Sequence, residues 1–331
     1  MKKLTAFSLI LSLSYLPIII FSTLPSSGSA NPESGLTNRI SNIEFPSSDI
    51  NYAESTLPLD MPDGSLKNIE ELHDPSLQQK LDKILTSNPK WAKLSKNKAL
   101  SIGVVDMDDP VNSRFAAING DQMMYAASLP KIAILLACED AIACGKLKET
   151  NEVKQDMRQM IAKSSNSAAS RMIERVGIDH IADVLQNSKY NLYDKNNGGG
   201  LWVGKAYGKG GTRKGDPLKN LSHAASVTQV AKFYYMLAFG QLVNAERSRH
   251  MLKMMSDPEL HHKFVSVLNK VAPNAKIYRK SGSWENWHAD SALVWSKERR
   301  YIVVALSNDS NGESMLRELM LKIDTAIISN S

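Results

Sequence analysis

Residues 277–307 read IYRKSGSWENWHADSALVWSKERRYIVVALS, and this stretch decides the fold. Apolar, aromatic and β-branched residues are concentrated in three runs, at Ile277–Ser281, His288–Ser296 and Tyr301–Ser307. Runs of this composition, separated by short polar turns, are typical of antiparallel strands. The sequence therefore predicts three consecutive antiparallel strands, with Lys280 on the first of them.

The rest of the chain adds further strands before a helical middle. Leu100–Met107 and Arg114–Ile118 predict a hairpin. A helix is predicted from Pro75, because Asp74 is a good N-cap and proline is favoured at the first helical position. Helical periodicity dominates between residues 127 and 176, a long irregular stretch at residues 187–221 follows, and helices return before residue 237 and at the C-terminal end. This order predicts an α/β fold: an antiparallel sheet flanked by helices, an all-helical lobe, and an active site in the cleft between them.

The first 30 residues are typical of an export signal. Two lysines precede a mostly apolar run that ends at Leu24, and Gly28–Ala30 supplies small residues for cleavage. The run is long and contains Pro17, so an uncleaved membrane anchor is the alternative. We expect a signal peptide at 1–30 and a domain that is periplasmic or secreted.

Residues 31–66 are rich in serine, proline, asparagine and acidic residues and show no apolar periodicity. A segment of this composition buries too little apolar surface to fold, so we expect a flexible linker. Residues 67–331 then form one folded domain.

The net charge is mildly positive. The 331 residues include 40 basic and 34 acidic side chains, a difference of +6, and loss of the two signal lysines would leave +4. This balance suits an anionic surface such as a cell wall, and it is also ordinary for a soluble protein. No basic stripe is interleaved with aromatic residues, so we expect no nucleic-acid partner. We expect a monomer.

The two cysteines, Cys138 and Cys144, stand six residues apart. Neighbours on one helix face lie three or four residues apart, so a disulfide would require the helix to end between them. The alternative is two small buried side chains. Neither the cysteines nor the scattered histidines show the spacing of zinc ligands, and we expect no metal and no cofactor.

Three short motifs follow one another along the chain: Ser128-Leu129-Pro130-Lys131, Ser164-Ser165-Asn166 and Lys280-Ser281-Gly282. The first is predicted at the start of a helix, where free backbone N–H groups favour developing negative charge. The second lies in a polar connection between two predicted helices, and the third lies on a predicted strand.

The first motif pairs a nucleophile with a base. A serine hydroxyl is a poor nucleophile until a base removes its proton. Lys131 follows Ser128 by three residues, so a helix would place both side chains on one face. A lysine that is desolvated in a cleft and flanked by Lys280 has a lowered pKa, and its free amine is then available as the base.

The ordered set of S-x-x-K, S-x-N and K-[ST]-G resembles that of the penicillin-recognising serine hydrolases, in particular the class A β-lactamase-like group. The resemblance covers residues 67–331 and implies the β-lactamase/DD-peptidase-like fold. It implies that Ser128 is acylated with Lys131 as base.

The resemblance also assigns roles to the second and third motifs. It implies that Ser164 passes protons and that Asn166 hydrogen-bonds the substrate amide. Lys280 would attract the substrate carboxylate, Ser281 would hydrogen-bond it, and Gly282 would let the substrate backbone approach closely. The N–H groups of Ser283 and Ser128 would form the oxyanion hole.

The sequence departs from the class A pattern where a glutamate activates the deacylating water. The equivalent stretch, residues 200–205, contains no acidic residue, and the nearest acids, Asp194 and Asp216, are displaced. The family arginine on the strand after the third motif is also not evident. His288 and Asp290 occupy that strand, where they either line the cleft or form a structural pair.

The first two motifs are close together. Ser128 and Ser164 are only 36 residues apart, which is short for the family and predicts a reduced helical lobe and a more open cleft.

The acylation machinery is therefore complete, and the class A deacylation machinery is not. The sequence predicts an exported active-site-serine hydrolase that forms an acyl-enzyme with β-lactams or related peptidoglycan stem peptides, with β-lactam hydrolysis as the outcome. The alternatives are a D-Ala-D-Ala peptidase or penicillin-binding protein, and a slowly deacylating β-lactam or cell-wall sensor. A scaffold without catalysis is disfavoured by the intact motifs.

Overall fold

The computed structural model describes residues 56–59, 66–208 and 210–328. The predicted signal peptide and most of the predicted linker lie outside these ranges. Within them, no helix combines the length and the apolar character that crossing a membrane requires.

A five-stranded antiparallel sheet forms the centre of the domain, with strand order β2-β1-β10-β9-β8. The predicted hairpin and the three predicted consecutive strands are present. Strands β8 and β10 extend one to three residues beyond the predicted runs at each end, β2 matches its run, and β1 and β9 end one residue before theirs. The edge strand β8 carries Lys280 and is joined to β9 by a two-residue turn. The strands are β1 (Leu100–Asp106), β2 (Arg114–Ile118), β8 (Lys276–Trp284), β9 (Trp287–Trp295) and β10 (Arg300–Asn308).

The first and last helices cover one face of this sheet. They bury a hydrophobic cluster that includes Leu81, Val303 and Leu319. A short helix that the sequence analysis did not predict follows the first one, because Asn88 caps it and Pro89 occupies its first position. The helices on this face are α1 (Pro75–Thr86), α2 (Pro89–Lys96), α9 (Phe264–Val271) and α10 (Gly312–Ile328).

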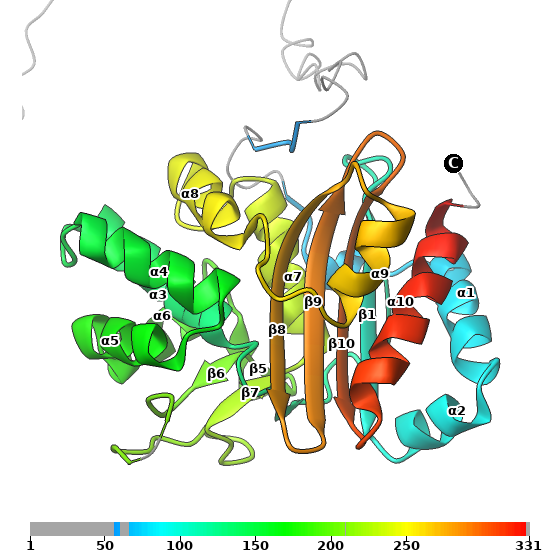
Figure 1. Cartoon of the computed structure of the whole chain (residues 1–331), viewed down its shortest axis with the longest axis horizontal. Helices are drawn as coiled ribbons and strands as arrows, with labels where there is room; N and C mark the ends of the chain where they lie inside the picture. Colours follow the sequence, from blue (N-terminus) through cyan, green and yellow to red (C-terminus); the bar gives the residue numbers. More distant parts are fainter. Residues whose placement is uncertain (1–55, 60–65, 209, 329–331) are drawn as a thin grey trace, which may run out of the picture. The chain divides into compact units, whose positions relative to one another are not determined.

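The opposite face packs on α7 (Val227–Ala238), whose residues are all buried. Beyond it lies the helical lobe, which Figure 1 shows beside the β8 edge and away from α1 and α10. The helices of this region are α3 (Lys131–Ala143), α4 (Asn151–Ala162), α5 (Asn166–Val176), α6 (Ile178–Gln186) and α8 (Ala245–Met255). The architecture is therefore the predicted one, a flanked antiparallel sheet with an all-helical lobe.

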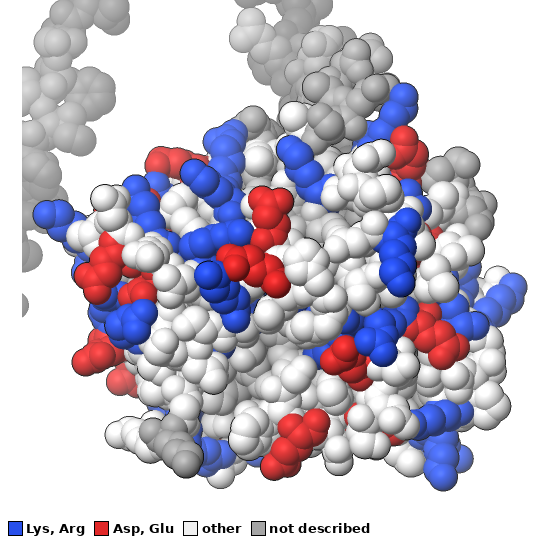
Figure 2. All heavy atoms as spheres, viewed as in Figure 1, with Lys and Arg blue, Asp and Glu red and all other residues white. Residues whose placement is uncertain are grey.

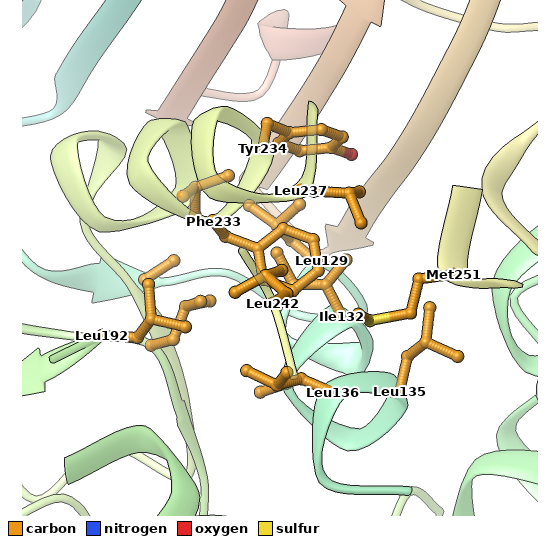
Figure 3. Close-up of a cluster of buried hydrophobic side chains, with 14 of the residues drawn as sticks. Leu129, Ile132, Leu135, Leu136, Leu192, Phe233, Tyr234, Leu237, Leu242 and Met251 are labelled. Atoms are coloured by element: carbon orange, nitrogen blue, oxygen red, sulfur yellow. The ribbon is translucent and has the colours of Figure 1, made fainter. Parts of the chain in front are cut away.

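Helix α3 is the centre of the lobe. Ten of its thirteen residues are buried, which is the pattern of a helix enclosed on all sides. Its apolar residues share a cluster with those of α7 (Figure 3). Burying a leucine or isoleucine side chain contributes about 1.5–3 kcal/mol, so this contact holds the first motif firmly against the sheet.

Short strands in the loops complete the domain. A three-residue strand, β7 (His223–Ala225), pairs with β3 (Met124–Tyr125) on one side and with β6 (Trp202–Val203) on the other. A small hairpin joins β4 (Tyr193–Asp194) to β5 (Gly199–Gly200). A 3-10 helix, η1 (Ile69–Leu72), precedes α1.

The two cysteines do not form a disulfide. Cys138 is buried inside α3, and Cys144 is exposed immediately after this helix ends. The expectation of two small buried side chains therefore holds for Cys138 only.

Charge is mixed over the surface shown in Figure 2. Lysines and arginines alternate with acidic residues on this face, with uncharged surface between them.

Candidate active site

The first motif forms a turn between β3 and α3. The prediction that the helix begins at Ser128 is wrong by three residues, since α3 begins at Lys131. Ser128 lies in the turn that leads into it, where the backbone N–H of Lys131 donates to the Ser128 carbonyl. Leu129 is fully buried in the α3–α7 cluster, whereas the neighbouring Ser128 is partly exposed.

Backbone strain precedes the serine. Ala127 has a φ of +49°, in the left-handed region that L residues with a Cβ avoid at a cost of about 1–2 kcal/mol. Such strain persists where the surroundings fix it, and it is frequent at functional sites. Here the Tyr207 hydroxyl donates to the Ala127 carbonyl at 3.2 Å and helps to hold the turn.

The Lys131 amine contacts three residues of the first two motifs. Its Nζ donates to the Ser164 carbonyl at 2.6 Å and to Asn166 Oδ1 at 2.7 Å, and it lies 3.1 Å from Ser128 Oγ. The first two partners are pure acceptors, so they use both N–H groups of a neutral amine. The lone pair of that amine is then left for the proton of Ser128.

Burial favours the neutral form of the Lys131 amine near physiological pH. Lys131 is fully buried, and desolvation lowers the pKa of its amine to about 7. No carboxylate is among the causes of this shift.

The second motif ends α4 and begins α5. Ser164 has a φ of +57° after the C-cap Lys163, and Ser165 is the N-cap of α5, accepting from the Ala168 N–H. This junction brings the Ser164 hydroxyl and carbonyl and the Asn166 amide to Lys131.

Ser164 Oγ links the two lysines. It lies 2.9 Å from Lys280 Nζ and 3.4 Å from Lys131 Nζ. Burial, then the neighbouring Lys131 and Arg279, lower the pKa of Lys280 well below its usual value. Two amines that share one hydroxyl do not both carry a charge without cost, so Ser164 is placed to pass a proton between them.

The third motif lies against the turn that contains Ser128. A Cβ on Gly282 would stand 2.2 Å from the Ala126 carbonyl oxygen and 2.8 Å from the Ser128 nitrogen, which only glycine avoids. The missing Gly282 side chain thus lets the protein's own backbone approach closely, as was expected of the substrate backbone. Ser281 is buried beside it, and its carbonyl accepts from Lys280 Nζ at 2.8 Å.

Ser283 follows on the free edge of the sheet. The turn at residues 285–286 closes the hairpin with a hydrogen-bonded pair at Trp284 and Trp287. Antiparallel pairs alternate between bonded and non-bonded, so Ser283 and His288 form a non-bonded pair. Because β8 is the edge strand, the Ser283 N–H points away from the sheet.

Comparison with known proteins identifies a family for the chain. A sequence profile of the beta-lactamase enzyme family matches residues 149–330, which is more than half of the chain and includes the second and third motifs. The chain belongs to this beta-lactamase enzyme family. A search of curated protein sequences gives no match.

Solved structures share the fold of this beta-lactamase family member at low sequence identity. A beta-lactamase from Sphaerobacter thermophilus is 16% identical, with a TM-score of 0.59 over 75% of this chain and 96% of that one. PBP-A is 18% identical, with a TM-score of 0.57 over 78% and 97%. A class A beta-lactamase representative from Bacteroides cellulosilyticus is 13% identical, with a TM-score of 0.57 over 77% and 100%.

Tyr207 stands over Lys131, and the sequence analysis did not single it out. Its ring centroid lies 4.4 Å from Lys131 Nζ and 4.3 Å from the centroid of the His223 ring. Its carbonyl accepts from Ser170 Oγ, which ties the loop to α5. An aromatic ring thus covers the Lys131 amine.

The acidic residues nearest in sequence to residues 200–205 accept hydrogen bonds within the loops. Asp216 is buried and accepts from the Tyr193 hydroxyl and from the N–H groups of Leu218, Lys219 and Leu221. Asp194 accepts from Asn196 and Asn197 in the β4–β5 turn. Neither is among the hydrogen-bond partners of Lys131.

Asp290 forms a structural ion pair, which is one of the two alternatives left open by the sequence. Its carboxylate is fully buried, pairs with Arg279 Nε at 2.7 Å and accepts from the Phe264 N–H at 3.1 Å. His288 is half-buried beside Gly312.

Two further observations concern metal binding and cavities. In the described ranges, no cluster of three or more histidine, cysteine or acidic side chains is arranged to hold a metal. A cavity of about 980 Å³ lies between α8, α9 and the start of β8, and none of the predicted site residues lines it.

Proposed function

We propose that this protein is an active-site-serine enzyme whose Ser128 is acylated by β-lactams or by D-Ala-D-Ala-like cell-wall peptides. The observation that carries the proposal is the arrangement around Lys131. Two acceptors hold its N–H groups, desolvation favours its neutral form, and its lone pair is left for Ser128 Oγ. This is how a buried lysine activates a serine.

The remaining groups fit one acyl-transfer step. Lys131 takes the Ser128 proton as Oγ attacks the carbonyl carbon, and the Ser128 and Ser283 N–H groups face the developing oxyanion. Ser164 then carries a proton toward the leaving nitrogen, supplied from the lysine pair on either side of it. Lys280, Ser281 and Asn166 hold the substrate carboxylate and amide.

Slow release of the acyl group is the second part of the proposal. Lys131 has no carboxylate partner among the described residues, and the Tyr207 ring occupies the space over its amine. A hydrolytic water needs a base of its own, so a penicillin-binding protein is favoured over an efficient β-lactamase. A PBP-A variant has been captured as an acyl-enzyme complex with penicillin G, and it shares this fold at 17% identity over 78% of this chain, with a TM-score of 0.55.

Export completes the proposal. The positive start, the apolar run and the small residues before Asn31 support a cleaved signal and a periplasmic or secreted domain. N-terminal sequencing of the mature protein should then begin at Asn31. A chain that retains its first 30 residues would indicate the membrane-anchored alternative.

The test is covalent labelling with a fluorescent penicillin followed by denaturing electrophoresis. We expect the native protein to label and the Ser128→Ala variant not to label, with unchanged circular dichroism. Ser167→Ala is the control, because Ser167 is an exposed serine of α5 that does not contact Lys131. Labelling of Ser128→Ala at the native level would mean that another residue is the nucleophile.

A further inference from the structure

A third buried lysine lies behind the third motif. Lys263 precedes α9, is fully buried, and has no role in the acyl-transfer step described above. Its Nζ donates to the Gly282 carbonyl at 2.6 Å, to Ser283 Oγ at 2.7 Å and to the Ala289 carbonyl at 3.1 Å. Three acceptors match the three N–H groups of a charged ammonium.

The first of these contacts falls on the peptide group that carries the oxyanion donor. The Gly282 carbonyl and the Ser283 N–H belong to one planar trans peptide and point in opposite directions. The carbonyl faces Lys263, and the N–H points off the free edge of β8. A positive charge at the carbonyl end polarises the whole amide and makes its N–H a stronger donor.

The backbone of Lys263 is itself strained. Its φ of +52° and ψ of −120° lie in a region that residues with a side chain rarely adopt. Asp290 Oδ2 accepts from the next N–H, that of Phe264, and Ser266 Oγ donates to the Lys263 carbonyl. Strain of this kind costs about 1–3 kcal/mol, so the surroundings must fix it.

Charged groups around Lys263 shift the pKa of its amine in both directions. Burial is the main cause that lowers the pKa of Lys263, to about 8, and Arg279 acts in the same direction. Asp290 and Glu313 raise it. The ammonium therefore stays largely protonated at neutral pH, although water does not reach it.

We propose that Lys263 is a positioning residue for the oxyanion hole: its ammonium fixes and polarises the Gly282–Ser283 peptide, so that the Ser283 N–H stabilises the tetrahedral intermediate on Ser128. The inference rests on the proposed acylation of Ser128. Lys263 does not touch the substrate and acts only through that peptide.

The test separates binding from acylation. Stopped-flow measurements with a chromogenic cephalosporin give the dissociation constant of the initial complex and the acylation rate constant. Loss of a complete oxyanion donor slows catalysis by about 10²–10³-fold, so weakening one donor in Lys263→Met should slow acylation by about tenfold. The dissociation constant should change by less than about twofold, because the ground-state carbonyl makes little use of the donor.

Two further variants and one control make the result specific. Lys263→Arg keeps the charge and should recover most of the rate, whereas Lys263→Gln keeps a donor without the charge and should remain slow. Lys232→Met is the matched control, since Lys232 is also buried, has a lowered pKa and donates to a backbone carbonyl, that of Asn191. It should acylate at the native rate.

A second readout addresses the oxyanion directly. Phenylboronic acid forms a tetrahedral anionic adduct on an active-site serine, and its affinity should fall in Lys263→Met in parallel with the acylation rate. If Lys263→Met does not fold, the comparison of Lys263→Gln with Lys263→Arg decides.

The outcomes distinguish the inference from the proposed function. Native-rate acylation in a folded Lys263→Met or Lys263→Gln variant, with unchanged boronate affinity, would overturn the inference and leave the proposed function intact. Absence of any acylation in the native protein would overturn the proposed function itself.

Discussion

The two sides of the Lys131 site differ in how their polar groups are used. On the motif side, side chains far apart in the sequence converge on the amines of Lys131 and Lys280. On the side of the 187–221 loops, Asp194 and Asp216 are used to shape turns, and a tyrosine ring covers the base. Under the proposed function, formation and release of the acyl-enzyme would therefore depend on different parts of the structure, and each could be altered separately.

The largest effect is expected on the motif side. Lys131→Ala removes the proposed base and should slow acylation by about 10²–10⁴-fold, the usual contribution of general base catalysis. Stopped-flow acylation with a chromogenic cephalosporin measures this rate, and Lys163→Ala, which removes an exposed lysine next to the second motif, is the control. Near-native acylation in Lys131→Ala would move the base to another residue.

The support of the third motif should matter more to stability than the ion pairs of the loops. Asp290→Asn leaves the Arg279 guanidinium without its buried charge partner and should cost about 3–5 kcal/mol in the free energy of unfolding. Lys214→Ala breaks an exposed pair with Asp179 on the loop side and should cost about 1 kcal/mol or less. Urea denaturation measures both, and equal losses would remove this difference between the two sides.

Introducing a carboxylate on the loop side should convert slow release into turnover. In Tyr207→Glu the new side chain stands near Lys131, where the ring now lies, and supplies a base for water. We expect deacylation to rise by about tenfold, well below the ideal contribution of such a base because the position is not optimised. The rate is followed by loss of the adduct in mass spectrometry. Tyr207→Phe, which keeps the ring, should release no faster than the native protein.

The pH dependence of acylation gives the smallest effect. The base acts only when neutral, and the pKa of Lys131 is about 7, so acylation should increase with pH up to about 7 and level off above it. In Tyr207→Glu the added negative charge favours the charged amine, so the rise should move to higher pH. A native profile without a change near pH 7 would contradict the assignment of Lys131.

The strands and the motif residues were predictable because their signals are local. Alternating and continuous apolar runs predicted β8, β9 and β10 to within three residues at each end. The first two motifs identified the residues that contact Lys131, and the third identified Lys280, which contacts Ser164. The start of α3 was misplaced because the turn at Ser128 already makes helix-like backbone hydrogen bonds.

The remaining site residues carry no sequence signal of their own. Tyr207 lies in an irregular loop, and Lys263 is one lysine among many; both reach the site only through tertiary packing. The positive φ angles of Ala127 and Ser164 were also unpredictable, since neither residue type favours the left-handed region as glycine does. Residues of this kind are found only when the fold is known.

The most direct test of the account is an intact-mass time course of the purified domain mixed with benzylpenicillin. The account predicts an adduct of one penicillin on Ser128 that forms readily and persists, with little hydrolysed drug. An adduct that disappears while hydrolysed drug accumulates would contradict the proposed slow release, and no adduct with any of several β-lactams would contradict the central claim that Ser128 is acylated.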